Sequence, residues 1–149
     1  MRTVLLDDRL LLDRLLGNES VPLRRILRGK RVATTGLWYY RLCHAIRSDL
    51  VTGALSGPFA AAPVDVRARA SASLVRLPDN IELTSLRDLV PTMADLISVH
   101  RLNVLSLEAL AAARHLEADI ALATSSENPA LMDAAGAEGL RLHTVAIGV

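Results

Sequence analysis

Short apolar runs alternate along this chain with longer segments in which apolar residues recur at helical spacing. A short run of β-branched residues, leucine or alanine between polar or turn residues is typical of a buried strand. The strands predicted in this way cover residues 3–6, 31–35, 119–124 and 140–147. Residues 81–83 form either a further short strand or the start of a helix.

Between these runs, apolar positions three and four residues apart predict amphipathic helices. A leucine-rich helix follows Asp8 and ends near Leu16, where Gly17 and Asn18 are residue types that end helices. The other predicted helices cover residues 22–28, 37–50, 65–77, 85–100 (interrupted or restarted at Pro91), 106–117 and 129–139. A loop is predicted around Gly53, Gly57, Pro58 and Pro63.

Strands separated by helices need crossover connections, which favour a parallel sheet with helices on both faces. We therefore predict a single three-layer α/β/α domain over residues 1–149, with a central, mostly parallel sheet of four to five strands. Ligands of such sheets bind beyond the carboxyl ends of the strands. Asp7, Thr35 and residues 124–126 lie at or just after the ends of predicted strands and are expected at that edge.

Composition narrows the function classes. The formal net charge is +1 and aromatic residues make up 3% of the chain, which disfavours a dedicated nucleic-acid binder with a broad basic face or stacking platforms. The sole cysteine, Cys43, excludes an intrachain disulfide and a cysteine-based zinc cluster. The start of the chain lacks the pattern of a signal peptide, and no apolar run is long enough to span a bilayer, so we expect a cytoplasmic protein without membrane contact.

Residues 4–7, 34–42 and 105–145 carry a resemblance to a known family. They resemble the PIN domain, the fold of the ribonuclease toxins of bacterial toxin-antitoxin pairs and of other metal-dependent RNA nucleases. Residues 4–7 are similar to the family's first strand, which ends in a metal-binding aspartate before a leucine-rich helix. Residues 105–145 follow the family's carboxyl-terminal pattern of helix, strand, helix and strand. Residues 34–42 resemble the segment in which the family places its second acidic residue on a helix.

The resemblance implies a site for Mg²⁺ or Mn²⁺ built from about four carboxylates, which activate water and neutralise charge on the phosphate. Asp7 matches the first acid and Glu108 is the nearest match to the third, so these two are the candidate catalytic and metal-binding residues. Arg41 or Tyr40 stands where the second acid would be. The rest of the candidate pocket is Asp8, Thr35, Thr124 and the two serines, Ser125 and Ser126, one of which replaces the fourth acid.

Each candidate also has a structural interpretation. Asp7 can cap the helix that follows it, and Glu108 can stabilise the first turn of its own helix. Residues 125–128 can serve only to cap the helix at Pro129. The absence of any metal is therefore as consistent with the sequence as a Mg²⁺ or Mn²⁺ site. An arginine at position 41 could replace an ion electrostatically or hold a phosphate without cleaving it.

Two functional hypotheses follow. The first is a PIN-like protein derived from metal-dependent ribonucleases, with an incomplete acidic site and weak or no nuclease activity. The second is a non-catalytic interaction module whose partner is an antitoxin-like protein, RNA or a second copy of the chain as a homodimer. The one dense basic cluster can contact RNA backbone or simply form a solvated helix face; it comprises Arg24, Arg25, Arg28, Lys30 and Arg31.

Overall fold

The computed structural model of the protein describes residues 1–47, 56–126 and 128–147. Within these ranges five strands form one sheet in the order β3-β2-β1-β4-β5, and every neighbouring pair is parallel. The strands are β1 (Thr3–Leu6), β2 (Arg31–Thr34), β3 (Ile81–Leu83), β4 (Asp119–Ala123) and β5 (Leu142–Val145). The predicted parallel sheet is thus confirmed, and residues 81–83 are a strand.

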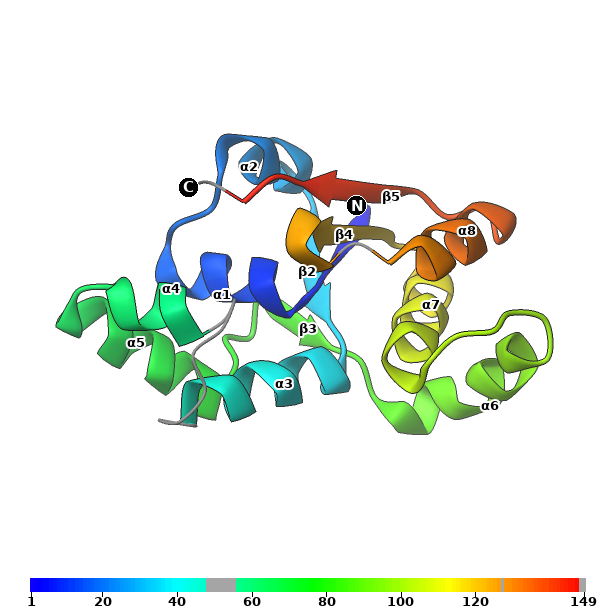
Figure 1. Ribbon diagram of the computed structural model, residues 1–149, viewed down its shortest axis with the longest axis horizontal. Coiled ribbons are helices and arrows are strands. Elements are labelled where there is room, and N and C mark those ends of the chain that lie inside the picture. The colour runs from blue at the N-terminus through cyan, green and yellow to red at the C-terminus, as the bar shows by residue number, and fades with distance from the viewer. Residues whose placement is uncertain (48–55, 127, 148–149) are drawn as a thin grey trace.

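Helices cover both faces of this sheet (Figure 1). They are α1 (Asp8–Leu16), α2 (Val21–Leu27), α3 (Gly36–Arg47), α4 (Ser56–Ala61), α5 (Val64–Val75), α6 (Leu86–Ile97), α7 (Val104–Leu116) and α8 (Pro129–Ala137), with a 3-10 turn, η1 (Thr124–Ser126), between β4 and α8. Because successive strand side chains point to opposite faces, β1 contributes to two separate cores. Val4 and Leu6 pack with α1, α2 and α5, whereas Leu5 packs with α6, α7 and α8. The three-layer α/β/α prediction is confirmed.

Residues at the helix ends explain most of the boundaries. Asp7, Ser20 and Asn128 each accept a hydrogen bond from the first turn of the helix that follows, as the N-cap position requires. Gly17 ends α1 with φ of 73°, a left-handed conformation that glycine adopts without the steric strain of a side chain. Capping residues therefore position the start of the two helices, α1 and α8, that border the site.

Two predictions about proline-containing segments are wrong. Gly57 and Pro58 lie in α4 and not in a loop, because Pro58 is in the first helical turn, where its missing N–H has no intrahelical acceptor to lose. Helix α6 continues through Pro91, which faces solvent, so water can solvate the carbonyl that loses its partner. Gly53 and the predicted end of the helix over residues 37–50 lie outside the described residues.

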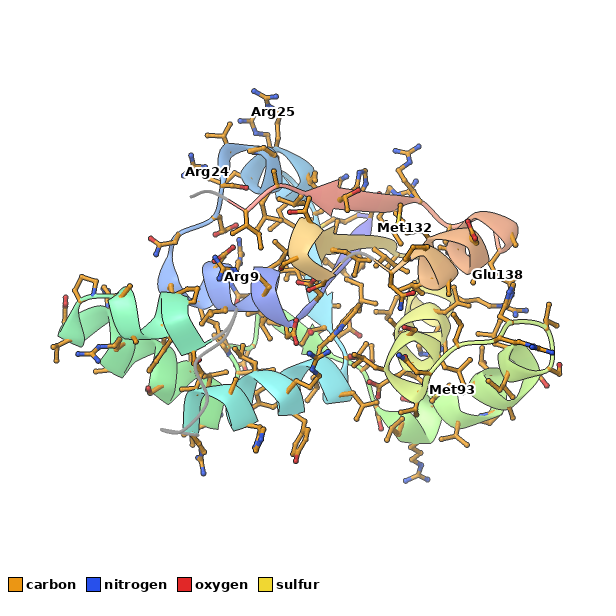
Figure 2. The ribbon with its side chains drawn as sticks, viewed as in Figure 1. Arg9, Arg24, Arg25, Met93, Met132 and Glu138 are labelled. Carbon is orange, nitrogen blue, oxygen red and sulfur yellow. The ribbon has the colours of Figure 1, made fainter. Side chains whose placement is uncertain are left out.

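The basic cluster lies on the surface around α2. Arg24 and Arg25 project outward from this helix (Figure 2), and both are exposed. Leu23 and Leu27 on the opposite side of α2 are buried in the core. This arrangement is that of an ordinary amphipathic surface helix.

Candidate functional site

The candidate site lies at the carboxyl edge of the sheet, where the strand order reverses. From β1 the chain moves outward to β2 and β3 on one side, and then crosses to β4 and β5 on the other. Crevices form at such switch points and are the usual ligand sites of open α/β sheets. Asp7 follows β1, Thr35 follows β2 and residues 124–126 follow β4, as the sequence predicts.

Asp7 joins three elements at this switch point. Its side chain is fully buried, and its Oδ1 accepts a hydrogen bond from the N–H of Leu10 in α1 at 2.8 Å. Its Oδ2 accepts one from the N–H of Ala123 at the end of β4, at 2.9 Å. Its own N–H donates to the carbonyl of Ala121 at 3.2 Å. Both carboxylate oxygens are therefore occupied by backbone donors.

Burial also sets the protonation of this group. Loss of solvent raises the pKa of Asp7 from 3.8 to about 6, against the opposing effects of the N–H groups of Leu10 and Ala123. The neighbouring charge of Asp8 raises this pKa further, and a hydrogen bond from Ser126 lowers it. The effect of Ser126 on this pKa shows that the two candidate residues, Asp7 and Ser126, lie close to each other at the switch point.

Glu108 caps a helix other than its own. Helix α7 begins at Val104, earlier than predicted, so Glu108 lies in the second turn and the predicted first-turn role is wrong. Its Oε1 accepts a hydrogen bond from the N–H of Leu37 in the first turn of α3, at 2.9 Å. Its Oε2 is buried without a hydrogen-bond donor, and a Cβ added at Gly36 would lie 3.5 Å from this atom.

Thr35, the residue just before α3, also caps the amino end of this helix. Its Oγ1 accepts a hydrogen bond from the N–H of Trp38 at 3.2 Å, and its carbonyl accepts one from the N–H of Tyr39 at 3.0 Å. The start of α3 therefore has two side-chain acceptors, one from Thr35 and one from Glu108. Their role in the structure is to satisfy the amino end of α3.

Asp8 and Arg41 form the charged pair of the site. The side chain of Asp8 is 5% exposed, and its Oδ2 lies 3.4 Å from Nε of Arg41, whose side chain is 55% exposed. Burial raises the pKa of Asp8, and the charge of Arg41 opposes that effect. Tyr40 instead is outside the lining of the adjacent pocket, is 63% exposed and stacks on His44. Of the two residues considered for the second acid's place, Arg41 is the one that faces the site.

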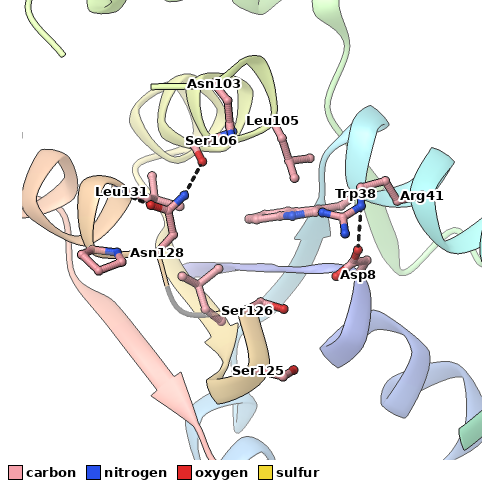
Figure 3. A pocket seen from close by; sticks show the side chains of 12 residues that line it. Asp8, Trp38, Arg41, Asn103, Leu105, Ser106, Ser125, Ser126, Asn128 and Leu131 are labelled. Carbon is pink, nitrogen blue, oxygen red and sulfur yellow. Dashed lines mark hydrogen bonds and ion pairs between the residues drawn. The ribbon is translucent and has the colours of Figure 1, made fainter. Parts of the chain in front are cut away.

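A pocket of about 340 Å³ opens beside this pair (Figure 3). Its polar lining comes from Asp8, Arg41, Asn103, Ser106, Ser125, Ser126 and Asn128, and its apolar lining from Trp38, Leu105, Leu122, Pro129 and Leu131. The amide of Asn128 donates to the hydroxyl of Ser106 at 2.7 Å and thereby ties the start of α8 to the first turn of α7. Asp8, Arg41, Ser125 and Ser126 were predicted for this pocket.

Sequence reasoning missed the wall formed by Asn103, Ser106 and Asn128. Asn128 was identified as a helix cap, and Asn103 is also one, accepting from the N–H of Ser106 at 2.9 Å. The sequence did hold a signal for this wall. Asn103 and Asn128 cap the helices just before and just after β4, and in a parallel sheet the amino ends of such helices lie at the same edge.

These residues are a poor fit for a metal ion. Asp7 and Glu108 are not among the residues that line the pocket. Three of their four carboxylate oxygens accept backbone N–H bonds, and the fourth, Oε2 of Glu108, has no donor. Over residues 1–47, 56–126 and 128–147, no group of three His, Cys, Asp or Glu side chains could hold an ion. Mg²⁺ and Mn²⁺ need several converging oxygen ligands with free lone pairs. The pocket instead offers a cation, hydroxyls and amides, which suit an anion.

The capping role of Glu108 predicts different effects for two substitutions. Glu108→Gln keeps an oxygen for the N–H of Leu37 and removes a buried charge, so its free energy of unfolding should stay within about 1 kcal/mol of the native value. Glu108→Ala leaves that N–H without its acceptor and should lose about 1–3 kcal/mol. Urea unfolding of both variants tests this, and equal losses would contradict the capping role.

The pKa of Asp7 predicts a pH-dependent cost for Asp7→Asn. The folded-state pKa, about 6, lies above the unfolded value of 3.8, so the stabilisation from Asp7 is complete below pH 3.8 and is lost as the pH rises through 6. The loss of stability in Asp7→Asn should therefore be about 1–3 kcal/mol smaller at pH 7 than at pH 4.5. Urea unfolding at both pH values measures it.

The matched control is Asp133→Asn, because Asp133 is exposed on α8 and should show no such trend. A loss for Asp7→Asn that grows with pH would show that the carboxylate is preferentially ionised in the folded protein.

Comparisons with known proteins give no family. No protein-family model matches the sequence, and the search of curated proteins finds no significant match. Among the described residues, no helix is both long enough and apolar enough to cross a membrane.

Proposed function

We propose that the protein is a PIN-like relative of metal-dependent ribonucleases that works in the cytoplasm, binds RNA and cleaves it slowly or not at all. The three-layer α/β/α fold supports the proposal, because it is the architecture that the resemblance implies. The position of Asp7 after β1, at the switch point of the sheet, also supports it.

The observation that carries the proposal is the pair of backbone hydrogen bonds to the carboxylate of Asp7. Metal-dependent cleavage of RNA needs carboxylates that hold an ion against the phosphate and activate water. Here Oδ1 and Oδ2 of Asp7 accept the N–H groups of Leu10 and Ala123 instead. An ion at Asp7 would have to share oxygens that already hold together β1, α1 and β4.

Arg41 supports binding in preference to cleavage. It brings a permanent positive charge into the pocket at the position where the resemblance expects an acid. A guanidinium binds phosphate oxygens well but cannot activate water as a metal ion does. Since the net charge of the chain is only +1, few phosphates are neutralised and the salt dependence of RNA binding should be shallow.

Binding and cleavage of a labelled single-stranded RNA test this proposal together. We expect binding in fluorescence anisotropy that is the same in EDTA as in Mn²⁺, and no new bands on a denaturing gel after prolonged incubation with Mn²⁺. Cleavage that requires Mn²⁺ and disappears in Asp7→Asn would instead establish a working nuclease. Failure to bind RNA under either condition would refute the RNA-binding part.

A second candidate, a module that binds an antitoxin-like protein or a second copy of the chain, is favoured by an exposed apolar stripe on α6. Leu86, Val90 and Ile97 are 46%, 53% and 48% exposed, and their spacing puts them on one side of the helix. Exposed apolar surface of this kind marks interaction sites when it is contiguous. Leu83 and Val99, just outside α6, are exposed as well.

For this second candidate, light scattering after size-exclusion chromatography gives a direct test. Self-association through α6 predicts a dimer for the native chain and a monomer for Val90→Glu, whose exposed position should leave the fold intact. A native monomer would exclude the homodimer. The antitoxin-like partner would then be the remaining version, and a small gene overlapping this one would favour it.

A further inference from the structure

We propose that the pocket binds the phosphate group of a nucleotide directly, without a metal ion, through Arg41, and that Asp8 is the positioning residue for Arg41. The inference rests on the proposed function only in naming RNA as one source of the phosphate. A free mononucleotide is the other source, and both present the same chemistry to the pocket.

The ion pair with Asp8 uses Nε of Arg41 and leaves the two terminal nitrogens of the guanidinium available to a ligand. The contact with Asp8 is made through Nε, at 3.4 Å from Oδ2. Among the described residues no contact of the two terminal nitrogens, Nη1 and Nη2, is recorded. These two nitrogens form the fork that binds phosphate oxygens in a bidentate way. A buried carboxylate behind the guanidinium limits how the fork can turn.

The acceptor atom of this ion pair, Oδ2 of Asp8, has no hydrogen bond of its own, which is a second indication of a ligand. Oδ1 accepts a hydrogen bond from the N–H of Arg9 at 2.8 Å, but Oδ2 is buried in the pocket lining with no hydrogen-bond donor. Oδ2 has lost water and has gained only the charge of Arg41, whose Nε lies 3.4 Å away, so its hydrogen-bonding capacity is not satisfied. A ligand that draws Arg41 closer, or that offers a ribose hydroxyl, would satisfy this oxygen.

The wall opposite Arg41 is polar and carries no acidic side chain among the described residues. Ser125 and Ser126 contribute hydroxyls, and Asn128 stands at the amino end of α8, where the helix dipole favours negative charge. In Figure 3 these side chains lie across the pocket from the pair formed by Asp8 and Arg41. A phosphate between the two walls would meet the charge of Arg41 on one side and the polar side chains of Ser125, Ser126 and Asn128 on the other.

The remainder of the pocket suits the rest of a nucleotide. Leu105, Leu122 and Leu131 give it an apolar part beside the polar walls, against which a base or sugar can pack. Its volume of about 340 Å³ falls within the range of small-molecule sites. The ligand class is therefore a phosphate attached to a nucleoside.

Titration calorimetry in EDTA, with adenosine monophosphate, inorganic phosphate and adenosine as probes, tests the inference. The native protein should bind the monophosphate, bind inorganic phosphate more weakly and not bind adenosine measurably. Arg41→Ala should weaken monophosphate binding at least about tenfold, the loss expected when a charged hydrogen-bonding partner is removed. The affinity of Arg41→Lys for the monophosphate should lie between those of the native protein and Arg41→Ala, because lysine keeps the charge but lacks the two terminal nitrogens of the guanidinium.

Arg47→Ala is the matched control, since Arg47 is also exposed on α3 but does not line this pocket. It should bind the monophosphate as the native protein does. Equal binding by Arg41→Ala and the native protein, or no phosphate binding by the native protein, would overturn the inference. Because Arg41 is more than half exposed, its variants should remain folded, which circular dichroism checks.

A double-mutant cycle tests the positioning role of Asp8. Asp8→Asn should weaken monophosphate binding in the native background and have no such effect when Arg41 is already alanine. Tighter binding in Asp8→Asn would mean that Asp8 merely repels the phosphate, and would overturn the positioning role. A purely structural role would instead weaken binding equally in both backgrounds.

RNA oligonucleotides with either a 5′-phosphate or a 5′-hydroxyl distinguish the sources. Tighter binding of the 5′-phosphate form, lost in Arg41→Ala, would assign the pocket to an RNA end. Monophosphate binding without RNA binding would refute the proposed function and leave the phosphate site standing. RNA binding that is unchanged in Arg41→Ala would support the proposed function and refute Arg41 as the group that binds the phosphate of RNA.

Discussion

The buried carboxylate of Asp7 is the constraint on which the site depends. A carboxylate removed from water is stable only when its oxygens find donors, and here the donors come from the first turn of α1 and from the end of β4. The same side chain therefore starts a helix and joins two neighbouring strands at the point where the strand order reverses. The crevice on the carboxyl side of the sheet takes its shape from these contacts.

The other two acids of the region serve different ends. Glu108 is directed at the amino end of α3, so its charge stabilises a helix start across a tertiary contact. Of the acids in the described part of the chain, Asp8 alone lines the pocket, and there it meets a guanidinium. Asp7 and Glu108 face backbone N–H groups, Asp8 is paired with Arg41, and the exposed charge is that of Arg41, so the site is arranged for holding an anion. This distribution, more than the number of acids, is the physical basis for proposing binding without efficient cleavage.

Local signals in the sequence were sufficient for the fold. Apolar runs identified the strands, and the dipeptide Asn128-Pro129 identified the start of α8. Short-range reasoning failed where solvent decided the outcome, as at Pro91, whose unpaired neighbouring carbonyl can be hydrated.

The site was predictable only in part, because its decisive contacts join residues far apart in sequence. The N–H that occupies Oδ2 of Asp7 is 116 residues away, and the one that occupies Glu108 is 71 residues away. No spacing rule relates such positions, so the sequence left ligand and cap as equal alternatives for Asp7. The choice between Tyr40 and Arg41 depended on the rotation of α3, which the burial of Trp38 and Leu42 sets.

The central claim is that both oxygens of Asp7 and Oε1 of Glu108 serve to accept backbone N–H groups and do not form a metal site. Nuclear magnetic resonance of the ¹⁵N-labelled protein during titration with Mn²⁺ tests it most directly, because this paramagnetic ion broadens the amide signals close to it. We predict that the amide signals of Leu10, Leu37 and Ala123 broaden no more than those of exposed residues elsewhere. Selective broadening of these three signals at low Mn²⁺ concentration would place an ion at the acids and contradict the account.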